Sequence, residues 1–450
     1  MKITVDGERH LGAVIGSDQF RENFVQQKIS NWIDDVKHLS EIGKDEPQLA
    51  LSAFNKALCM RWGFMQRTIE GIAEKFEPLE NIIREKFIPA IVGRKVSDII
   101  ERRILALPIR FGGLGIQNPV LTAQLEFETS TTVTQDLKQI IINQEKDLQN
   151  YNPDTVKLKI ACSKVEKVKR FENEFNEIKL LVNEKLKRSL DFATEKGSGA
   201  WLTALPIQSL GFVLNKSEFR DGIALRYGWK IPNTPFHCRC GEKNDVDHTL
   251  NCKLGGFVNM RHNAIRDLEA NLLREVCKDV KTEPELLPVG NVKLHGTTDP
   301  KARPDVSAVG IWSQMERTFL DVCVIHPNSP SYLNKTPEQL YITNENRKKN
   351  KYNDRIIQVQ KGSFTPLIFS TYGGMGPECT RYHKKVAQLI SKKRNENYAD
   401  VMNVIRTKIR FSLMKTTLVA VRGERGRSSR ENHTSDISYN TVPSAAEYEV

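Results

Sequence analysis

The chain has 450 residues, 39% of them hydrophobic, which is enough for several domains with cores of their own. It carries 67 Lys and Arg residues against 55 Asp and Glu residues, a net charge of +12. No apolar run approaches the length of a membrane span, and the first residues do not form a secretory signal, so we expect neither a membrane protein nor a secreted one. We predict a nuclear location, or a cytoplasmic one before nuclear import.

The N-terminal stretch predicts a hairpin and then a helix. The hairpin is expected over residues 3–14, with Asp6-Gly7 as its turn signal. Apolar residues recur at intervals of three and four over residues 25–39, which indicates a helix that Gly43 would end. Further helical pattern follows, so the N-terminal region as a whole is expected to be helical.

Residues 121–196 are highly charged but carry an apolar stripe at helical spacing, so we expect paired helices that pack on a neighbour. The stripe consists of Val165, Val168, Phe171, Phe175, Ile178, Val182 and Leu186. The run Gly197-Ser198-Gly199 then predicts a joint before the next segment.

A compact group of metal-ligating residues lies beyond this joint: Cys238, Cys240, His248 and Cys252. Three thiolates and one imidazole are the donors of a closed, four-coordinate structural zinc site. A segment this short has almost no core, so metal binding would be needed to fold it. The alternative is three buried thiols and a surface histidine. The other cysteines are scattered, which is typical of free thiols in a reducing compartment.

Two aspartates beyond the zinc motif indicate a second metal site. Asp305 opens one predicted strand, and Asp321 lies inside the next, after a turn over residues 310–317. A charged residue among strand-forming apolar residues is costly unless it has a partner. Carboxylate oxygens suit Mg²⁺ or Mn²⁺, which can activate water for phosphodiester hydrolysis. The pair therefore predicts a catalytic metal site, and the alternative is that Asp321 faces water on an edge strand.

A site of this kind usually includes a lysine that aims the water or steadies the leaving oxygen. The residue two positions past Asp321 is Cys323, which cannot do this. A basic helix is predicted over residues 344–360, and a helical lysine there can reach over a sheet. We therefore predict Lys348 as the third catalytic residue, with Lys349 as the second choice.

Positive charge is concentrated in residues 341–400, which hold twelve Lys and Arg residues against five Asp and Glu residues. Phosphate backbones are the natural partner of such a stretch, although a solvated basic face would have the same composition. A strand is predicted over residues 364–370 and a basic helix over residues 381–415. The residues predicted to contact nucleic acid are Arg303, Lys384, Lys385, Lys392 and Lys393.

These motifs together resemble the C-terminal part of non-LTR (LINE-type) retrotransposon proteins that carry a restriction-enzyme-like endonuclease, such as elements that insert into ribosomal RNA genes. The zinc motif resembles their Cys-Cys-His-Cys knuckle. The Arg-Pro-Asp run that ends at Asp305, and then Asp321, resemble the motifs of their nuclease. Residues 9–12 and 107–116 are similar to parts of the end of their reverse transcriptase.

The resemblance implies an endonuclease module that depends on Mg²⁺ or Mn²⁺ and nicks target DNA for target-primed reverse transcription. DNA is the implied partner, element RNA is a second candidate, and the oligomeric state is left open. The chain has no Tyr/Phe-x-Asp-Asp strand turn, so the polymerase palm is missing and no reverse transcription is expected from it alone. The alternative function is a catalytically dead remnant that only binds nucleic acid.

The predicted fold class is α+β and multidomain, with a helical thumb and linker region, a small zinc knuckle and a restriction-endonuclease-like α/β core. The predicted domains are a reverse-transcriptase thumb remnant (1–120), a charged helical linker (121–200), a further linker with the knuckle (201–256), the endonuclease (257–415) and a disordered tail (416–450).

Overall fold

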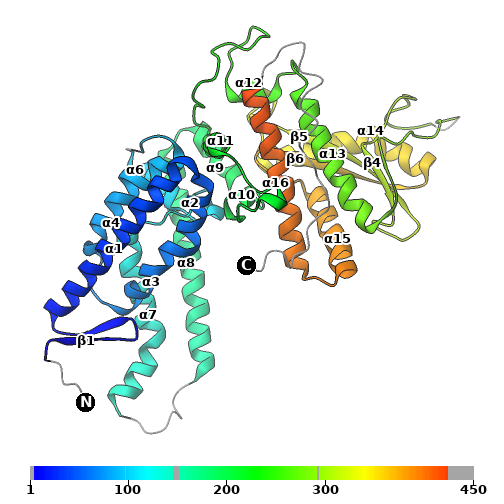
Figure 1. The fold of residues 1–450 in the computed structure, drawn as a ribbon. Helices are drawn as coiled ribbons and strands as arrows, with labels where there is room; N and C mark the ends of the chain where they lie inside the picture. Colours follow the sequence, from blue (N-terminus) through cyan, green and yellow to red (C-terminus); the bar gives the residue numbers. More distant parts are fainter. Residues whose placement is uncertain (1–4, 97, 145–151, 291–292, 424–450) are drawn as a thin grey trace. The chain divides into compact units, whose positions relative to one another are not determined.

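The computed structural model has a mostly helical α+β fold with one mixed four-stranded sheet (Figure 1). It describes residues 5–96, 98–144, 152–290 and 293–423. The chain forms two compact units: a helical unit, Met1–Lys187 with Leu214–Arg220, and a sheet unit, Arg188–Val213 with Asp221–Val450. Among the described residues, no helix combines the length and the apolar character that crossing a membrane requires.

The helical unit begins with the predicted hairpin, but its turn lies elsewhere. Strands β1 (Gly7–His10) and β2 (Ala13–Gly16) pair in antiparallel fashion, and the turn is Leu11-Gly12 rather than Asp6-Gly7. Both turn residues have positive φ, 48° and 84°, as a two-residue hairpin turn of the primed type requires. The Asp-Gly pair was a misleading signal because Gly7 is already inside the first strand.

The first helix is longer than predicted. Helix α1 runs over Asp18–Asp45, so the prediction that Gly43 ends it is wrong. Gly43 is buried inside the helix, and a Cβ there would lie 3.2 Å from Ile91 and 3.3 Å from Ala50. The glycine therefore permits close helix packing, and the helix ends just before Pro47.

Short helices then surround an aromatic core in the helical unit. Phe54 and Phe87 stack with ring centroids 4.4 Å apart, and Trp32 meets Trp62 edge-on at 6.0 Å. The helical segments are α2 (Pro47–Ala53), η1 (Phe54–Leu58), α3 (Cys59–Thr68), η2 (Glu74–Phe76), α4 (Glu77–Ile82), η3 (Ile83–Phe87), α5 (Ile88–Val92), α6 (Ile99–Ala106) and η4 (Ile109–Phe111).

The two long helices predicted after residue 121 are present as α7 (Pro119–Ile142) and α8 (Pro153–Leu181). The predicted apolar stripe follows α8 only as far as Ile178, because the helix ends at Leu181. Its last member, Leu186, belongs to a separate helix, α9 (Glu184–Ala193). The stripe therefore continues across a helix end that the periodicity did not reveal.

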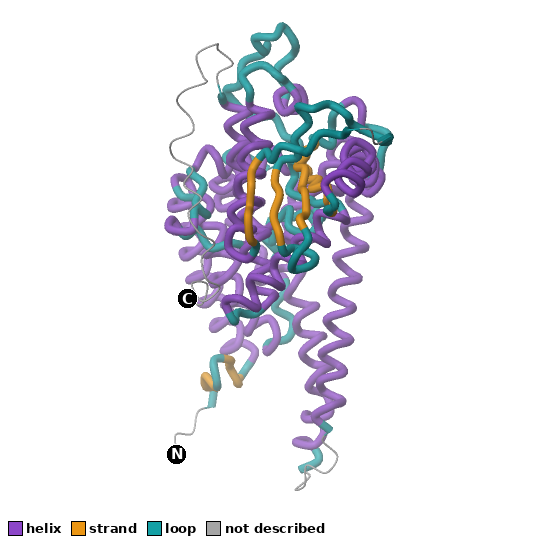
Figure 2. Tube along the Cα trace, turned by 90° about the vertical axis from the view of Figure 1, so that its right-hand side faces the viewer, coloured by secondary structure: helices purple, strands orange, loops and turns teal. Residues whose placement is uncertain are grey.

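Among its described residues, the sheet unit contains four strands in the order β3-β4-β5-β6. Figure 2 shows strands of this sheet side by side, in orange. Their ranges are β3 (Lys278–Thr282), β4 (Val306–Val309), β5 (Arg317–Ile325) and β6 (Ser363–Ser370). The pairs β3/β4 and β4/β5 are antiparallel, and β5/β6 is parallel, with Asp321 opposite Pro366. The predicted strand hairpin and the predicted strand near residues 364–370 are confirmed, whereas β3 was not predicted.

Helices cover both faces of this sheet. One face packs on α13 (Phe257–Val276), α15 (Pro377–Arg394) and α16 (Tyr398–Arg422) through a core that includes Leu320 and Val322. The other face, with Phe319 and Ile325, packs on α14 (Pro337–Arg355). Because side chains alternate along a strand, Asp321 points to the α14 side.

The C-terminal part differs from the prediction in two ways. The basic helix predicted over residues 381–415 is two helices, because Asn395 adopts a left-handed conformation with φ 57° and ends α15. The predicted tail from residue 416 begins too early, since α16 runs to Arg422 with Leu418 and Val421 buried. Residues 424–450, where the rest of that tail falls, lie outside the described residues.

Shorter segments complete the sheet unit and its neighbours in sequence. They are α10 (Ala200–Thr203), η6 (Gln208–Leu210), α11 (Lys216–Tyr227), α12 (Val246–Asn251), η7 (Pro330–Tyr332) and η8 (Ile356–Gln360).

Candidate functional site

The four predicted zinc ligands meet in the structure. One donor atom from each of Cys238, Cys240, His248 and Cys252 lies within 4.8 Å of all the others. The sulfurs of Cys238 and Cys252 are 3.8 Å apart, and the Cys240 sulfur lies 3.2 Å from His248 Nε2. Zinc–sulfur bonds of about 2.3 Å in a tetrahedron would separate two sulfurs by roughly 3.8 Å, so the cluster is consistent with a zinc site.

The local fold explains how so short a segment gathers its donors. The Gly241 amide donates to the Cys238 carbonyl at 2.9 Å, and Gly241 has φ 95°, so the chain turns tightly between the first two ligands and the rest. Asp245 then caps α12 by accepting the His248 amide at 2.8 Å. The helix carries His248, and Cys252 follows at its end.

The knuckle, residues 238–252, is bonded to the end of the sheet. His326, buried just after β5, lies 2.9 Å from Asp247 on one ring nitrogen and 2.9 Å from the Thr371 hydroxyl on the other. The Ser329 hydroxyl donates to Asn251 at 2.8 Å. These contacts place the knuckle inside the sheet unit rather than on a free linker.

The two predicted aspartates lie side by side across the β4/β5 pair. The Asp305 amide donates to the Leu320 carbonyl at 2.9 Å, and the Val322 amide donates to Asp305 Oδ2 at 2.6 Å. Asp305 therefore bonds to the main chain on both sides of Asp321. His262 on α13 places its Nε2 3.1 Å from the same Asp305 oxygen.

Lys348 on α14 forms an ion pair with Asp321 Oδ2, an oxygen that makes no hydrogen bond of ordinary geometry. Asp321 is only 3% exposed. Burial raises the pKa of Asp321, Lys348 opposes this, and the neighbouring charge of Asp305 raises it further. The side chain is therefore a buried acid with one cationic partner.

The charges of Asp305 and Asp321 also shift the pKa values of their basic partners, Lys348 and His262. Burial alone would lower the pKa of Lys348, but Asp321, Cys323 and Asp305 outweigh it, and the net pKa is raised. His262 behaves in the same way: burial would lower its pKa, and the hydrogen bond and charge of Asp305 raise it above the ordinary value. Lys348 is thus an ammonium at neutral pH.

The structure brings some predicted residues together and leaves others apart. Asp305, Asp321 and Lys348 converge, whereas Lys349 pairs with Glu378 at 2.7 Å, at the start of α15. The residues predicted to contact nucleic acid lie at the surface. Arg303 pairs with Glu285. Three of the lysines are exposed and one is half-exposed: Lys384, Lys392 and Lys393 are exposed, and Lys385 is half-exposed.

The sequence did not point to His262, and of the basic residues on the predicted helix over residues 344–360 it favoured Lys348 over Arg347. His262 lies three positions before Ile265 and therefore beside the apolar stripe of its helix. A histidine at that position is the sequence feature that could have indicated a site residue. Arg347 places a guanidinium nitrogen 3.6 Å from the Cys323 sulfur, on the strand of Asp321. No spacing rule connects residues on α14 to a particular strand position.

The donor chemistry of the aspartate pair suits a hard divalent cation. Mg²⁺ commonly uses one or two carboxylates and keeps several waters. Asp305 and Asp321 supply two carboxylates, and the buried Oδ2 of Asp321 has the Lys348 ammonium as its ion-pair partner. Among the described residues, however, the Cys/His knuckle is the group in which three or more ligand atoms are already mutually close.

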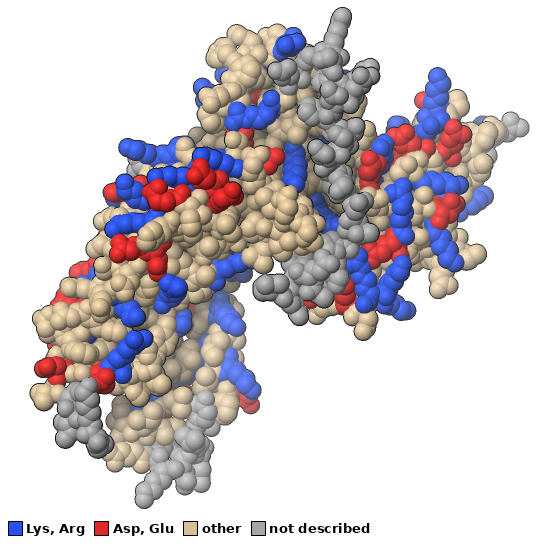
Figure 3. All heavy atoms as spheres, in the orientation of Figure 1, with Lys and Arg blue, Asp and Glu red and all other residues tan. Residues whose placement is uncertain are grey.

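The basic stretch is partly neutralised in the folded chain. Arg394 forms a two-bond ion pair with Glu275, and Arg381 pairs with Glu378 at 2.9 Å. On the face drawn in Figure 3, Lys and Arg side chains are interspersed with Asp and Glu over each unit. The net positive charge of residues 341–400 therefore does not form one uninterrupted basic surface on that face.

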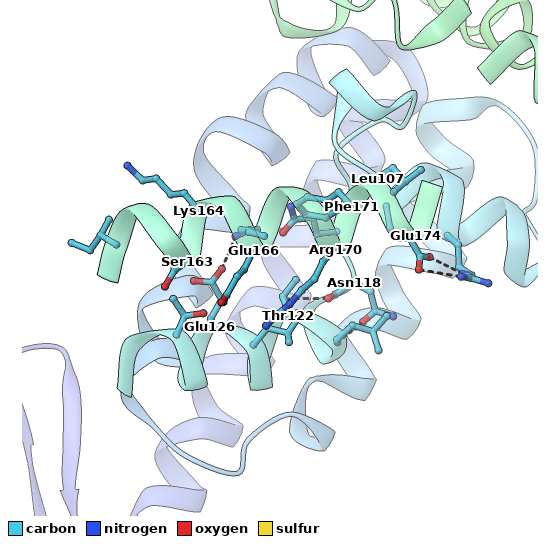
Figure 4. A pocket seen from close by; sticks show the side chains of 18 of the residues that line it. Leu107, Asn118, Thr122, Glu126, Ser163, Lys164, Glu166, Arg170, Phe171 and Glu174 are labelled. Carbon is cyan, nitrogen blue, oxygen red and sulfur yellow. Dashed lines mark hydrogen bonds and ion pairs between the residues drawn. The ribbon is translucent and has the colours of Figure 1, made fainter. Parts of the chain in front are cut away.

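The helical unit contains a separate cavity of about 360 Å³ between α7 and α8 (Figure 4). Aliphatic side chains such as Leu121 and Leu125 line it together with Phe171. Charged groups at its margin pair with each other: Glu126 with Lys167 at 2.7 Å, and Glu174 with Arg103 at 2.7 Å. These ion pairs join residues of the same unit to each other, and they do not indicate a catalytic group.

No protein-family model matches the chain, and no curated protein is similar enough to count as a relative.

Proposed function

We propose that the sheet unit is a metal-dependent DNA endonuclease module with a restriction-endonuclease-like core, which nicks target DNA as in target-primed reverse transcription. The observation that carries this proposal is the convergence of Asp305, Asp321 and Lys348. They come from a strand start, the neighbouring strand and a helix that crosses over the sheet. The resemblance of the motifs to non-LTR retrotransposon nucleases supports the same function.

Asp305 and Asp321 would hold Mg²⁺ or Mn²⁺, which when bound supplies Lewis-acid activation of water and charge neutralisation on the phosphate. Lys348 keeps its proton because its pKa is raised, so it acts as a fixed positive charge and not as a base. A cation placed where negative charge develops favours the transition state. His262 holds the Asp305 carboxylate in place from the α13 side.

The knuckle is proposed as a structural zinc site because all four of its positions are protein donors. DNA is the proposed partner of the module, with element RNA as the second candidate, and the nucleus is the proposed location. Exposed lysines on α15, including Lys384 and Lys392, are proposed to contact phosphates. Reverse transcription is not part of the proposal, since the sequence has no palm motif.

One observation favours the alternative, a remnant that binds nucleic acid without cleaving it. Each carboxylate already has a cationic or hydrogen-bonding partner from the protein itself, Lys348 for Asp321 and His262 for Asp305. Such partners would stabilise the pair with no metal present. Activity is therefore the property that separates the two functions.

The test is nicking of supercoiled plasmid in Mg²⁺ and in Mn²⁺, with wild type and Asp321→Asn. The substitution keeps the shape and removes the charge, so nicking should fall at least about 100-fold, since metal-derived stabilisation is worth several kcal/mol. DNA affinity should be unchanged or slightly raised, because one negative charge near the phosphates is removed. Zinc content should not change, because no knuckle ligand is altered.

Asp279→Asn is the matched control. Asp279 is an exposed aspartate of the same sheet that pairs with Arg317, so its loss should leave nicking intact. Equal nicking by Asp321→Asn and wild type would remove Asp321 from the site. Tight DNA binding by a wild-type protein that never nicks would establish the remnant.

A further inference from the structure

A small cavity in the sheet unit is lined by two arginine side chains. It has a volume of about 20 Å³ and lies where α12 of the knuckle meets α16 and the ends of β5 and β6. Arg226, Arg410, His326 and Thr417 are among the side chains that line it. None of the described residues that line it is an aspartate or a glutamate.

Arg410 brings an uncompensated charge to this place. It is 5% exposed, and its guanidinium donates to two main-chain carbonyls, those of Ser198 at 3.0 Å and Thr371 at 3.2 Å. Neutral acceptors satisfy its hydrogen bonds but leave its charge in place. A buried charge of this kind is costly unless a counter-charge lies close to it.

A second guanidinium adds to the positive potential. Burial lowers the pKa of Arg410 to about 9, and the nearby charge of Arg226 contributes to the same shift. A pKa of that size leaves the guanidinium protonated at neutral pH. The carboxylate nearest in the hydrogen-bond network, that of Asp247, is bonded to His326.

A polar atom independently indicates that something occupies the cavity. Thr417 is 2% exposed, and its hydroxyl oxygen has no hydrogen-bond partner. A buried hydroxyl in this state is unusual in folded proteins. Its neighbour Thr416 shows the ordinary case, because its hydroxyl donates to the Ser412 carbonyl at 2.7 Å.

The geometry points to a buried halide site in this cavity, with chloride held by the Arg410 guanidinium and the Thr417 hydroxyl. The size of the cavity limits the ligand. One water molecule needs roughly 10–15 Å³ of cavity volume, and this cavity has about 20 Å³, so a monatomic ion fits and a tetrahedral oxyanion does not. Chloride supplies the negative charge that a water cannot. It would also fix the knuckle helix, through Val246 and Leu250, against α16.

The first test measures thermal unfolding of the zinc-loaded chain while sodium chloride replaces sodium gluconate at constant ionic strength. Because a ligand that binds only the folded state stabilises it, Tm should rise with chloride concentration. Thr417→Val removes one hydrogen bond to the ion and should raise the chloride concentration needed for half of the effect about tenfold. Thr416→Val, the matched control, should keep the wild-type chloride dependence.

The second test uses crystals of the wild-type chain soaked in sodium bromide. An anomalous peak beside Arg410 and Thr417, inside the cavity, would establish the site. A Tm that is independent of chloride, together with no bromide peak in the cavity, would overturn the proposal and leave a water as the occupant. Loss of chloride dependence in Thr416→Val as well as Thr417→Val would also overturn it, because the effect would then be one of helix packing.

Discussion

The two candidate metal sites of the sheet unit are built in opposite ways. The knuckle takes its donors from one stretch, Cys238 to Cys252, and a tight turn with a short helix brings them together. The aspartate site takes its side chains from three separate elements: Asp305 just before the start of β4, Asp321 inside β5 and Lys348 on helix α14. A contiguous site depends on its ligand to hold it, whereas a dispersed site depends on the surrounding fold.

The largest expected effect separates the two sites by their dependence on metal. Cys240→Ser should lose the bound zinc and loosen residues 238–252, since structural zinc contributes on the order of 10 kcal/mol to folding in small zinc modules. The helical unit has its own core and should keep its structure. Elemental analysis together with amide hydrogen exchange measures both results. Wild-type protein that contains no zinc would contradict the prediction.

The next effect concerns the buried ion pair of the dispersed site. Lys348→Met leaves the Asp321 carboxylate buried without its cation and should lower the free energy of unfolding by about 3 kcal/mol. Lys349→Met is the matched control: its pair with Glu378 is partly exposed, so the loss should be at most about 1 kcal/mol. Urea unfolding measures both variants. Equal losses would show that the fold does not depend on the buried pair.

The loss in Lys348→Met should depend on pH in a defined direction. The pKa of Asp321 is raised in the folded chain, so the folded state binds a proton more readily than the unfolded state does. The penalty is therefore present above the folded pKa of Asp321 and decreases as pH falls through it, because a protonated carboxyl needs no cation. In an Asp321→Asn background, Lys348→Met should cost much less than in wild type at pH values above the folded pKa of Asp321, and this pH dependence should disappear.

The smallest expected effect concerns the lysines of α15 that are proposed to contact DNA. Replacing Lys384, Lys385, Lys392 and Lys393 with Ala should flatten the plot of log affinity for DNA against log salt, by up to about 0.9 for each of these lysines that neutralises a phosphate. The control set is Lys86, Lys164, Lys169 and Lys185 in the helical unit, exposed residues whose replacement changes the net charge equally. An unchanged slope in the α15 variant would place the DNA-binding surface elsewhere.

Contiguity also explains which features could be predicted from the sequence. The four knuckle donors and the strands around Asp305 and Asp321 follow local rules, of ligand type and spacing and of strand periodicity. His262 could not be inferred as a partner of Asp305, because their contact depends on how α13 packs on the sheet. Strand β3 escaped detection because its sequence, Lys278–Thr282, is largely exposed and polar.

The positions of helix ends also differ from the prediction. One predicted end is absent from the structure, and one end in the structure is not predicted. The sequence predicts that Gly43 ends the first helix, but close packing against Ile91 makes a glycine useful inside the helix. The sequence predicts one helix through Asn395, but an asparagine tolerates the left-handed conformation that ends α15. Of the two lysines that the sequence predicts for the aspartate site, Lys348 forms an ion pair with Asp321, and its catalytic role stays a prediction.

Strand β6 forms one edge of the four-stranded sheet, and Pro366 lies in it opposite Asp321. A proline has no amide hydrogen, so it cannot take part in a full ladder of main-chain bonds on both sides of its strand. An added strand from another chain would find a missing donor midway along this edge. The residue that lies opposite Asp321 in the sheet therefore leaves this edge one main-chain donor short for pairing with another strand.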